Sequence, residues 1–317
     1  MTKNDQSGQF RRGDKTMSNG NNENKPKGPS ELDILFIRTA LYQNRHSFRE
    51  VFEFVARFTS LSPYNAMLVR IQRPGATYVA SADEWKEKFN RTVRPGANPL
   101  IILIPFGPVR FVYDLQDTEG TEPFPQELLE PFRIDDRHYE AHCRRWLNEL
   151  IPRVAADGIG YYEANYGTNL AGKIVTEKPP YKVQRYGSGR RTSRKIKIAY
   201  NLIINRNLGY TEKFVTVLHE LAHLYCGHQG SFDTSRWPDR RGLPVNIREI
   251  EAESTAWLVC RRLGLNTRSE KYLSNYISRE SGVLHKFSLD TVLRAVGIIE
   301  RRLKGPVAPV KDLVIND

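Results

Sequence analysis

A five-residue motif, HELAH at residues 219–223, sets the tightest limit on the architecture of this chain. Around it, apolar residues recur at helical spacing and Gly227 supplies a stop, which predicts a helix over 211–226. Four residues apart on a helix, the Cβ atoms of His219 and His223 are about 5–6 Å apart. Two imidazoles at that spacing can bind one zinc ion at about 2.0–2.1 Å. The motif therefore predicts a helix that carries two metal ligands.

Glu220, directly after the first histidine, is the candidate general base. A divalent ion lowers the pKa of water to about 7, and a neighbouring carboxylate can then take up the proton. The alternative is an ordinary helix with two surface histidines, and the apolar context argues against it. We therefore expect a zinc centre with Glu220 beside it.

A catalytic zinc site needs a third protein ligand. His228 is nearest in sequence, but the spacing of a third histidine in metzincins points to Gln229 instead. Further along, Glu249 and Glu253 share one helical face, whereas Glu251 is turned away from it. Our hypothesis is that Glu249 binds the metal and that Glu253 accepts the outer N–H of a ligating histidine, with Glu253 as the alternative ligand. The competing interpretation is an acidic helix N-terminus, which the helix dipole favours.

The length of 317 residues suggests two domains in an α+β fold. Residues 1–30 are polar and predict a disordered segment, followed by domains at 31–131 and 132–317. In the first domain, two apolar runs at 100–105 and 109–115 predict a hairpin, and 118–131 predicts a linker. In the second, we expect helices over 139–150, 211–226, 246–263, 269–280 and 288–303, and a strand at 195–198.

No apolar run approaches the roughly 18 residues of a membrane span, and no signal-peptide pattern opens the sequence. We expect a cytoplasmic chain that does not contact membranes. Its three cysteines, Cys143, Cys226 and Cys260, are widely spaced and predict buried thiols, not disulfides.

Lys and Arg outnumber Asp and Glu by 48 to 36, a formal net charge of +12 that favours phosphate-rich partners. Single strands are bound by basic grooves with aromatic faces for stacking. The slightly acidic first domain offers four arginines near Trp85 and Tyr64, namely Arg70, Arg73, Arg91 and Arg94. A basic, acid-free stretch follows at 182–197, with Lys182, Arg185, Arg190, Arg191 and Arg194 as candidate contacts. The alternatives are aromatic core residues with solvated arginines, and a solvated hairpin tip.

The stretch HELAHLYCGH, followed by Trp237-Pro238 and REIEAESTAWLVCRRLGL, resembles the zincin-type peptidase domain of ArdC-like antirestriction proteins and of the related ImmA/IrrE metallo-endopeptidases. Upstream, SPYNAMLVRIQRPGATYVASADEW, VRPGANPLIILIPF and VYDLQDTEG resemble the N-terminal domain of ArdC-like proteins, which is associated with single-stranded DNA binding. Together these matches cover roughly residues 45–280.

The resemblance implies a gluzincin-like zinc metallopeptidase with His219, His223 and Glu249 as ligands, joined to a single-stranded DNA-binding domain. A rival function is a non-catalytic DNA-binding antirestriction protein whose zinc site is structural or vestigial. A third is a regulatory peptidase that cleaves one repressor. The sequence names no substrate.

Overall fold

The computed structural model describes residues 30–38, 45–105, 107, 109–129, 134–168, 170–179, 181–187, 193–266 and 284–315. It is an α+β fold, as the sequence predicts. The predicted disorder of residues 1–29, the helix over 269–280 and the domain boundary at 131/132 lie outside these residues. None of the helices in the described ranges is long and apolar enough to cross a membrane.

Within the described residues, the N-terminal part combines four α-helices with short strands. Its elements are α1 (Glu31–Arg38), α2 (Arg45–Arg57), α3 (Pro63–Gln72), β1 (Val79–Ala80), α4 (Ala82–Phe89), β2 (Thr92–Val93), β3 (Leu100–Ile102), β4 (Arg110–Asp114) and β5 (Thr118–Glu119). The predicted hairpin is confirmed, because β3 and β4 pair antiparallel with Leu100 opposite Val112. Strand β1 joins β4 on its other side, and β2 pairs with β5. Trp85 and Phe124 form a small core of their own beneath α4.

The C-terminal part carries the longer elements. They are α5 (Tyr139–Val154), β6 (Ile159–Ala164), β7 (Gly172–Thr176), β8 (Lys182–Tyr186), β9 (Arg194–Ile198), β10 (Tyr200–Asn205), α6 (Tyr210–Tyr225), α7 (Val245–Arg262), α9 (Leu289–Lys304) and β11 (Val314–Ile315). The helices predicted over 211–226, 246–263 and 288–303 are confirmed within one residue at each end. The predicted strand at 195–198 is confirmed as part of β9.

Two sheets organise this part. Strand β10 is central in the first, parallel to β6 and antiparallel to β7, so β7 is an edge strand of the described sheet. Helix α6 packs against β7 and β10, and α7 packs along α6. The second sheet has the order β11-β9-β8. The edge strand β7 and helix α6 therefore lie side by side, which places the HELAH motif at an open edge of the sheet.

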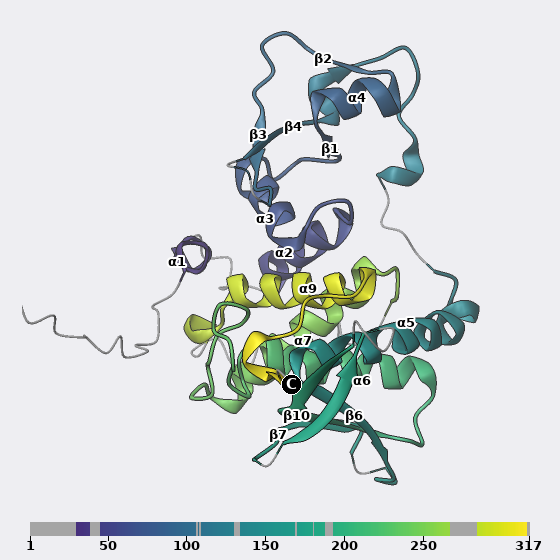
Figure 1. The fold of residues 1–317 in the computed structure, drawn as a ribbon. Helices are drawn as coiled ribbons and strands as arrows, with labels where there is room; N and C mark the ends of the chain where they lie inside the picture. The colour runs from purple at the N-terminus through teal and green to yellow at the C-terminus, as the bar shows by residue number, and fades with distance from the viewer. Residues whose placement is uncertain are drawn as a thin grey trace, which may run out of the picture.

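One hydrophobic core runs through both parts. Helices α2 and α3 pack against α7 and α9, and the buried side chains of all four belong to the same cluster as those of α6 and β10. Figure 1 shows α9 lying between the N-terminal elements and the helices and sheet that surround α6. Arg262 reinforces this junction, because its guanidinium group donates to the carbonyls of Val55, Phe58 and Leu61. The helices around the motif thus pack against the N-terminal helices on one side and against the sheet on the other.

Candidate metal centre

Helix α6 presents the motif because its two faces differ. Val217, Leu218, Leu221 and Leu224 are fully buried, whereas the opposite face carries His219 and His223. The helix ends at Tyr225, and the chain then turns at Gly227, which has a φ of +84°. A Cβ there would lie 2.2 Å from the carbonyl oxygen of Pro238, so only glycine fits.

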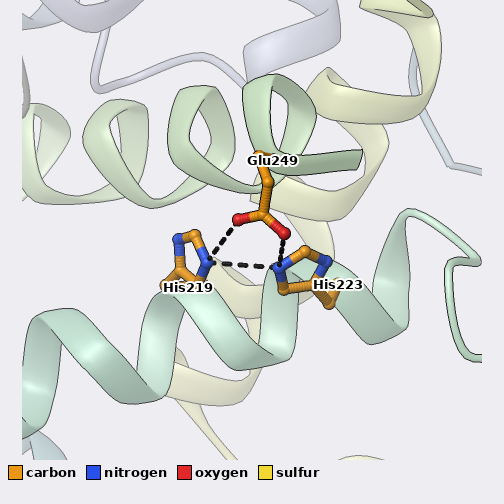
Figure 2. A group of neighbouring side chains, drawn as sticks. All are labelled: His219, His223 and Glu249. Carbon is orange, nitrogen blue, oxygen red and sulfur yellow. Dashed lines mark hydrogen bonds and ion pairs between the residues drawn. The ribbon is translucent and has the colours of Figure 1, made fainter. Parts of the chain in front are cut away.

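The structure brings His219, His223 and Glu249 together. The Nε2 atoms of the two histidines are 3.1 Å apart, and each lies 3.5 Å from a different carboxylate oxygen of Glu249. Figure 2 shows Glu249 reaching down from α7 between the two rings on α6. Ligands held tetrahedrally at about 2.0–2.1 Å from an ion are about 3.3 Å apart. The observed separations match that value, and the three residues fit a divalent ion.

Glu253, one turn after Glu249 on α7, supports the first histidine. Its Oε2 lies 3.2 Å from Nδ1 of His219 and accepts a hydrogen bond from the N–H there. The lone pair of His219 Nε2 is then left for the metal, which is the usual role of a carboxylate behind a ligating histidine. The structure therefore places Glu249 toward the rings and Glu253 behind one of them.

The carboxylates give this site a strongly negative field. Burial alone would lower the pKa of His219, but hydrogen bonds with Glu249 and Glu253 outweigh it and raise that pKa to about 10. The same hydrogen bonds to His219 and His223 hold the pKa of Glu249 well below its usual range. The negative charge of the carboxylates makes His219 retain its proton. The same charge favours binding of a divalent cation, because the cation also neutralises it.

Glu220 lies on the same helix and points toward β7. Its Oε2 accepts the backbone N–H of Ile174 at 2.9 Å, which anchors the carboxylate beside the edge strand. Burial raises the pKa of Glu220, and the neighbouring His219 and His223 oppose that shift. A carboxylate with a raised pKa, held next to a metal site, is suited to accepting and releasing a proton.

A second polar cluster lies behind His223. The chain turns back at Gly227, and His228 then lies beneath the end of α6 with its Nδ1 3.0 Å from Nδ1 of His223. Its Nε2 lies 2.9 Å from Glu251, which also accepts bonds from Arg240 at 2.6 and 2.8 Å and from the backbone N–H of Ser288 at 2.8 Å. His228 and Glu251 have fully buried side chains.

The sequence predicts no role for His228 and Glu251 and argues against both as metal ligands. Glu251 is turned away from Glu249, as expected, but it is a buried hydrogen-bond acceptor and not a solvated acid. One signal could have pointed to His228: a histidine directly after a glycine that reverses the chain is brought back against the last turn of the helix. Nothing in the local sequence indicated that Arg240 would pair with Glu251.

Cys226, His228 and Glu251 also have ligand atoms close enough to hold an ion. The chemistry argues against it, because the guanidinium group of Arg240 already occupies both carboxylate oxygens of Glu251. Burial also raises the pKa of Cys226 to about 12, so the thiol stays protonated. All three cysteines are free and buried, which confirms the expectation from the sequence.

The four N-terminal arginines predicted to contact nucleic acid differ in their surroundings. Arg70 lies over the ring of Phe54, Arg73 pairs with Asp117, and Arg91 donates to the side chain and carbonyl of Thr118. Arg94 is exposed. The expected stacking face is missing at Trp85, which is completely buried and donates its indole N–H to a backbone carbonyl. For Trp85 the core alternative is correct.

The basic stretch forms the hairpin β8–β9. In its register Val183 is opposite Lys197, and Arg185 is opposite Lys195. Since Ile196 and Ile198 are buried on the inner face, these four side chains lie on the outer face. Lys182 lies over the ring of Tyr162, and Arg194 is exposed, whereas Arg190 and Arg191 are outside the described residues.

Comparison with known proteins returns structures but no sequence family. No family model matches the chain, and no curated protein matches it. Two solved structures of the antirestriction protein ArdC from plasmid R388 do, one metal-free and one with Mn(II) bound. The chain is similar to ArdC.

The similarity to ArdC is distant. The two ArdC structures have 13% and 12% sequence identity with this chain and TM-scores of 0.33 and 0.31. Each alignment covers 83% of this chain and 98% of ArdC. At such TM-scores the likeness to ArdC says nothing about individual residues or activity.

Proposed function

We propose that the chain is a zinc-dependent metallopeptidase. The observation that carries the proposal is the convergence of His219 Nε2, His223 Nε2 and the Glu249 carboxylate at mutual separations of 3.1–3.5 Å. Two imidazoles and one carboxylate are one of the ligand sets of catalytic zinc sites, which leave a fourth position for water or substrate. Bound there, zinc would polarise a scissile carbonyl and lower the pKa of water.

The protein's own groups supply the proton transfers and the substrate contacts. Glu220 is anchored through one oxygen by the Ile174 N–H, so its other oxygen is available to accept a proton and later to deliver it to the leaving amine. Strand β7 pairs with β10 on one side, and the Ile174 N–H shows that its other side faces Glu220. An extended peptide could pair with the remaining backbone groups on that side, as peptides do at exposed sheet edges. The edge and the base together favour a peptide substrate.

The test compares three zinc-loaded proteins on a mixed peptide library. Wild type should cleave, whereas Glu220→Gln should retain zinc and lose roughly 10²–10⁴-fold in rate. Glu212→Gln is the matched control, because Glu212 lies two turns earlier on α6 and caps the backbone N–H of Gly209. It should cleave at the wild-type rate. Wild-type protein that binds one zinc and cleaves nothing, or equal cleavage by Glu220→Gln, would refute the peptidase.

A second candidate function is binding of single-stranded DNA, within the antirestriction role that the sequence resemblance implies. The outer face of β8–β9 supports it, because Arg185, Lys195 and Lys197 lie together there with exposed Val183. Affinity that arises from phosphate contacts falls steeply with salt. A labelled oligonucleotide titrated at two salt concentrations should bind wild type more weakly at high salt, and Arg185→Gln should flatten that dependence. Lys304→Gln, an exposed cation on α9, is the control.

A further inference from the structure

The hydrogen-bond partners of the histidine behind the metal site restrict where its protons lie. Nδ1 of His223 and Nδ1 of His228 are 3.0 Å apart, which requires a single proton between them. The other nitrogen of His228 lies 2.9 Å from Oε2 of Glu251, a carboxylate that also accepts two bonds from Arg240. An ionised carboxylate only accepts, so Nε2 of His228 must carry the proton.

The remaining positions follow from that one. A neutral His228 with its proton on Nε2 has a lone pair on Nδ1, and it therefore accepts from Nδ1–H of His223. His223 is then left with its own lone pair on Nε2, the atom that lies 3.1 Å from Nε2 of His219. Each link in the chain from Glu251 to His223 thus sets the tautomer of the next.

We propose that His228 is a positioning residue that fixes the tautomer and ring orientation of His223, and that Glu251 and Arg240 in turn hold His228. This inference rests on the proposed metal site. It makes the two ligating histidines unequal, because His219 is held by a carboxylate directly and His223 through an intervening imidazole. Groups that hold ligating histidines typically contribute 10–100-fold to metal affinity.

The surroundings explain why an imidazole takes this place. The backbone N–H of His228 donates to the carbonyl oxygen of His223, so the turn itself brings the side chain under the ring. The side chain of His228 is fully buried, so no water competes for Nδ1 of His223. The Glu251 carboxylate is the hub of the arrangement, because it accepts from His228, Arg240 and Ser288 at once.

The experiment measures zinc affinity by competition with a chromophoric chelator. His228→Phe keeps a planar ring but has no acceptor, and it should bind zinc 10–100-fold more weakly than wild type. His228→Gln can present an amide oxygen to Nδ1–H of His223 and should recover most of that loss. His142→Phe, on α5 and hydrogen-bonded to Arg145, is the matched control and should leave zinc affinity unchanged.

A second readout separates positioning from general packing. Nitrogen NMR of the metal-free protein should place the proton of His223 on Nδ1 in wild type and His228→Gln, and give a mixture of tautomers in His228→Phe. Equal zinc affinity of wild type and His228→Phe, or equal losses in the phenylalanine and glutamine variants, would overturn the proposal. Neither measurement involves hydrolysis, so tight zinc binding without cleavage would remove the peptidase and leave the positioning role standing.

Discussion

Two clusters of metal-type side chains flank His223, and their chemistry differs. On one side, His219, His223 and Glu249 converge, and within the described residues the carboxylate pairs with these histidines and with no arginine or lysine. On the other, His228 and Glu251 lie equally close to Cys226, but the guanidinium group of Arg240 is bonded to the carboxylate. The difference shows that residue type and spacing do not make a metal site by themselves. What decides is whether a guanidinium group already occupies both oxygens of the carboxylate.

The two clusters also differ in their exposure to solvent. Glu249 keeps a third of its side-chain surface exposed, whereas the side chains of His228 and Glu251 have none. A buried carboxylate must be paired and hydrogen-bonded to be tolerated. An open one can exchange its partner for an ion, which suits the first cluster to chemistry and the second to support.

The largest effect is expected from removing a ligand of the open cluster. His219→Ala and Glu249→Ala should each abolish stoichiometric zinc binding, because two remaining ligands cannot hold the ion as three do. Metal analysis after gel filtration measures this directly. Glu212→Gln, on the same helix as His219, should still carry one zinc per chain. Retention of zinc by Glu249→Ala would shift the third ligand to Glu253.

The buried cluster should respond in stability instead. Arg240→Leu leaves the Glu251 carboxylate buried without its cation, and breaking such a pair costs about 3–5 kcal/mol. Urea unfolding in the presence of a chelator measures the loss without any contribution from metal. Arg241→Leu is the matched control, because Arg241 is paired with Asp239 at the surface, where such pairs contribute about 0–1 kcal/mol. Similar losses in both variants would show that Arg240 is no more important than a surface residue.

The two clusters also differ in how much of each could be predicted from the sequence. The HELAH spacing and the one-face pairing of Glu249 with Glu253 depend only on helical geometry, and the structure places all four residues accordingly. Helix limits followed from apolar periodicity in the same way. The partnership of Arg240, Glu251 and Ser288 joins a loop, α7 and the start of α9, and no local pattern encodes contacts between segments so far apart. Trp85 likewise became core through partners such as Phe124, distant in sequence.

A smaller effect is expected behind the first ligand. Glu253→Gln keeps an oxygen that can accept from Nδ1 of His219 but removes its negative charge. Zinc affinity should fall by about tenfold, at the lower end of what such supporting groups contribute. Chelator competition measures it. A loss as complete as that of Glu249→Ala would instead make Glu253 a ligand and erase the distinction between the two glutamates on α7.

The smallest effect is expected at the cysteine of the buried cluster. Cys226→Ser should leave zinc stoichiometry at one per chain and affinity within about twofold, because a protonated thiol beside Thr255 is not a ligand. The hydroxyl can keep a hydrogen bond to Thr255, so the fold should be retained. A second equivalent of zinc that binds wild type and is lost in Cys226→Ser would contradict the distinction between the two clusters. It would mean that Arg240 yields its place on Glu251 to a metal, and that the buried cluster is a metal site after all.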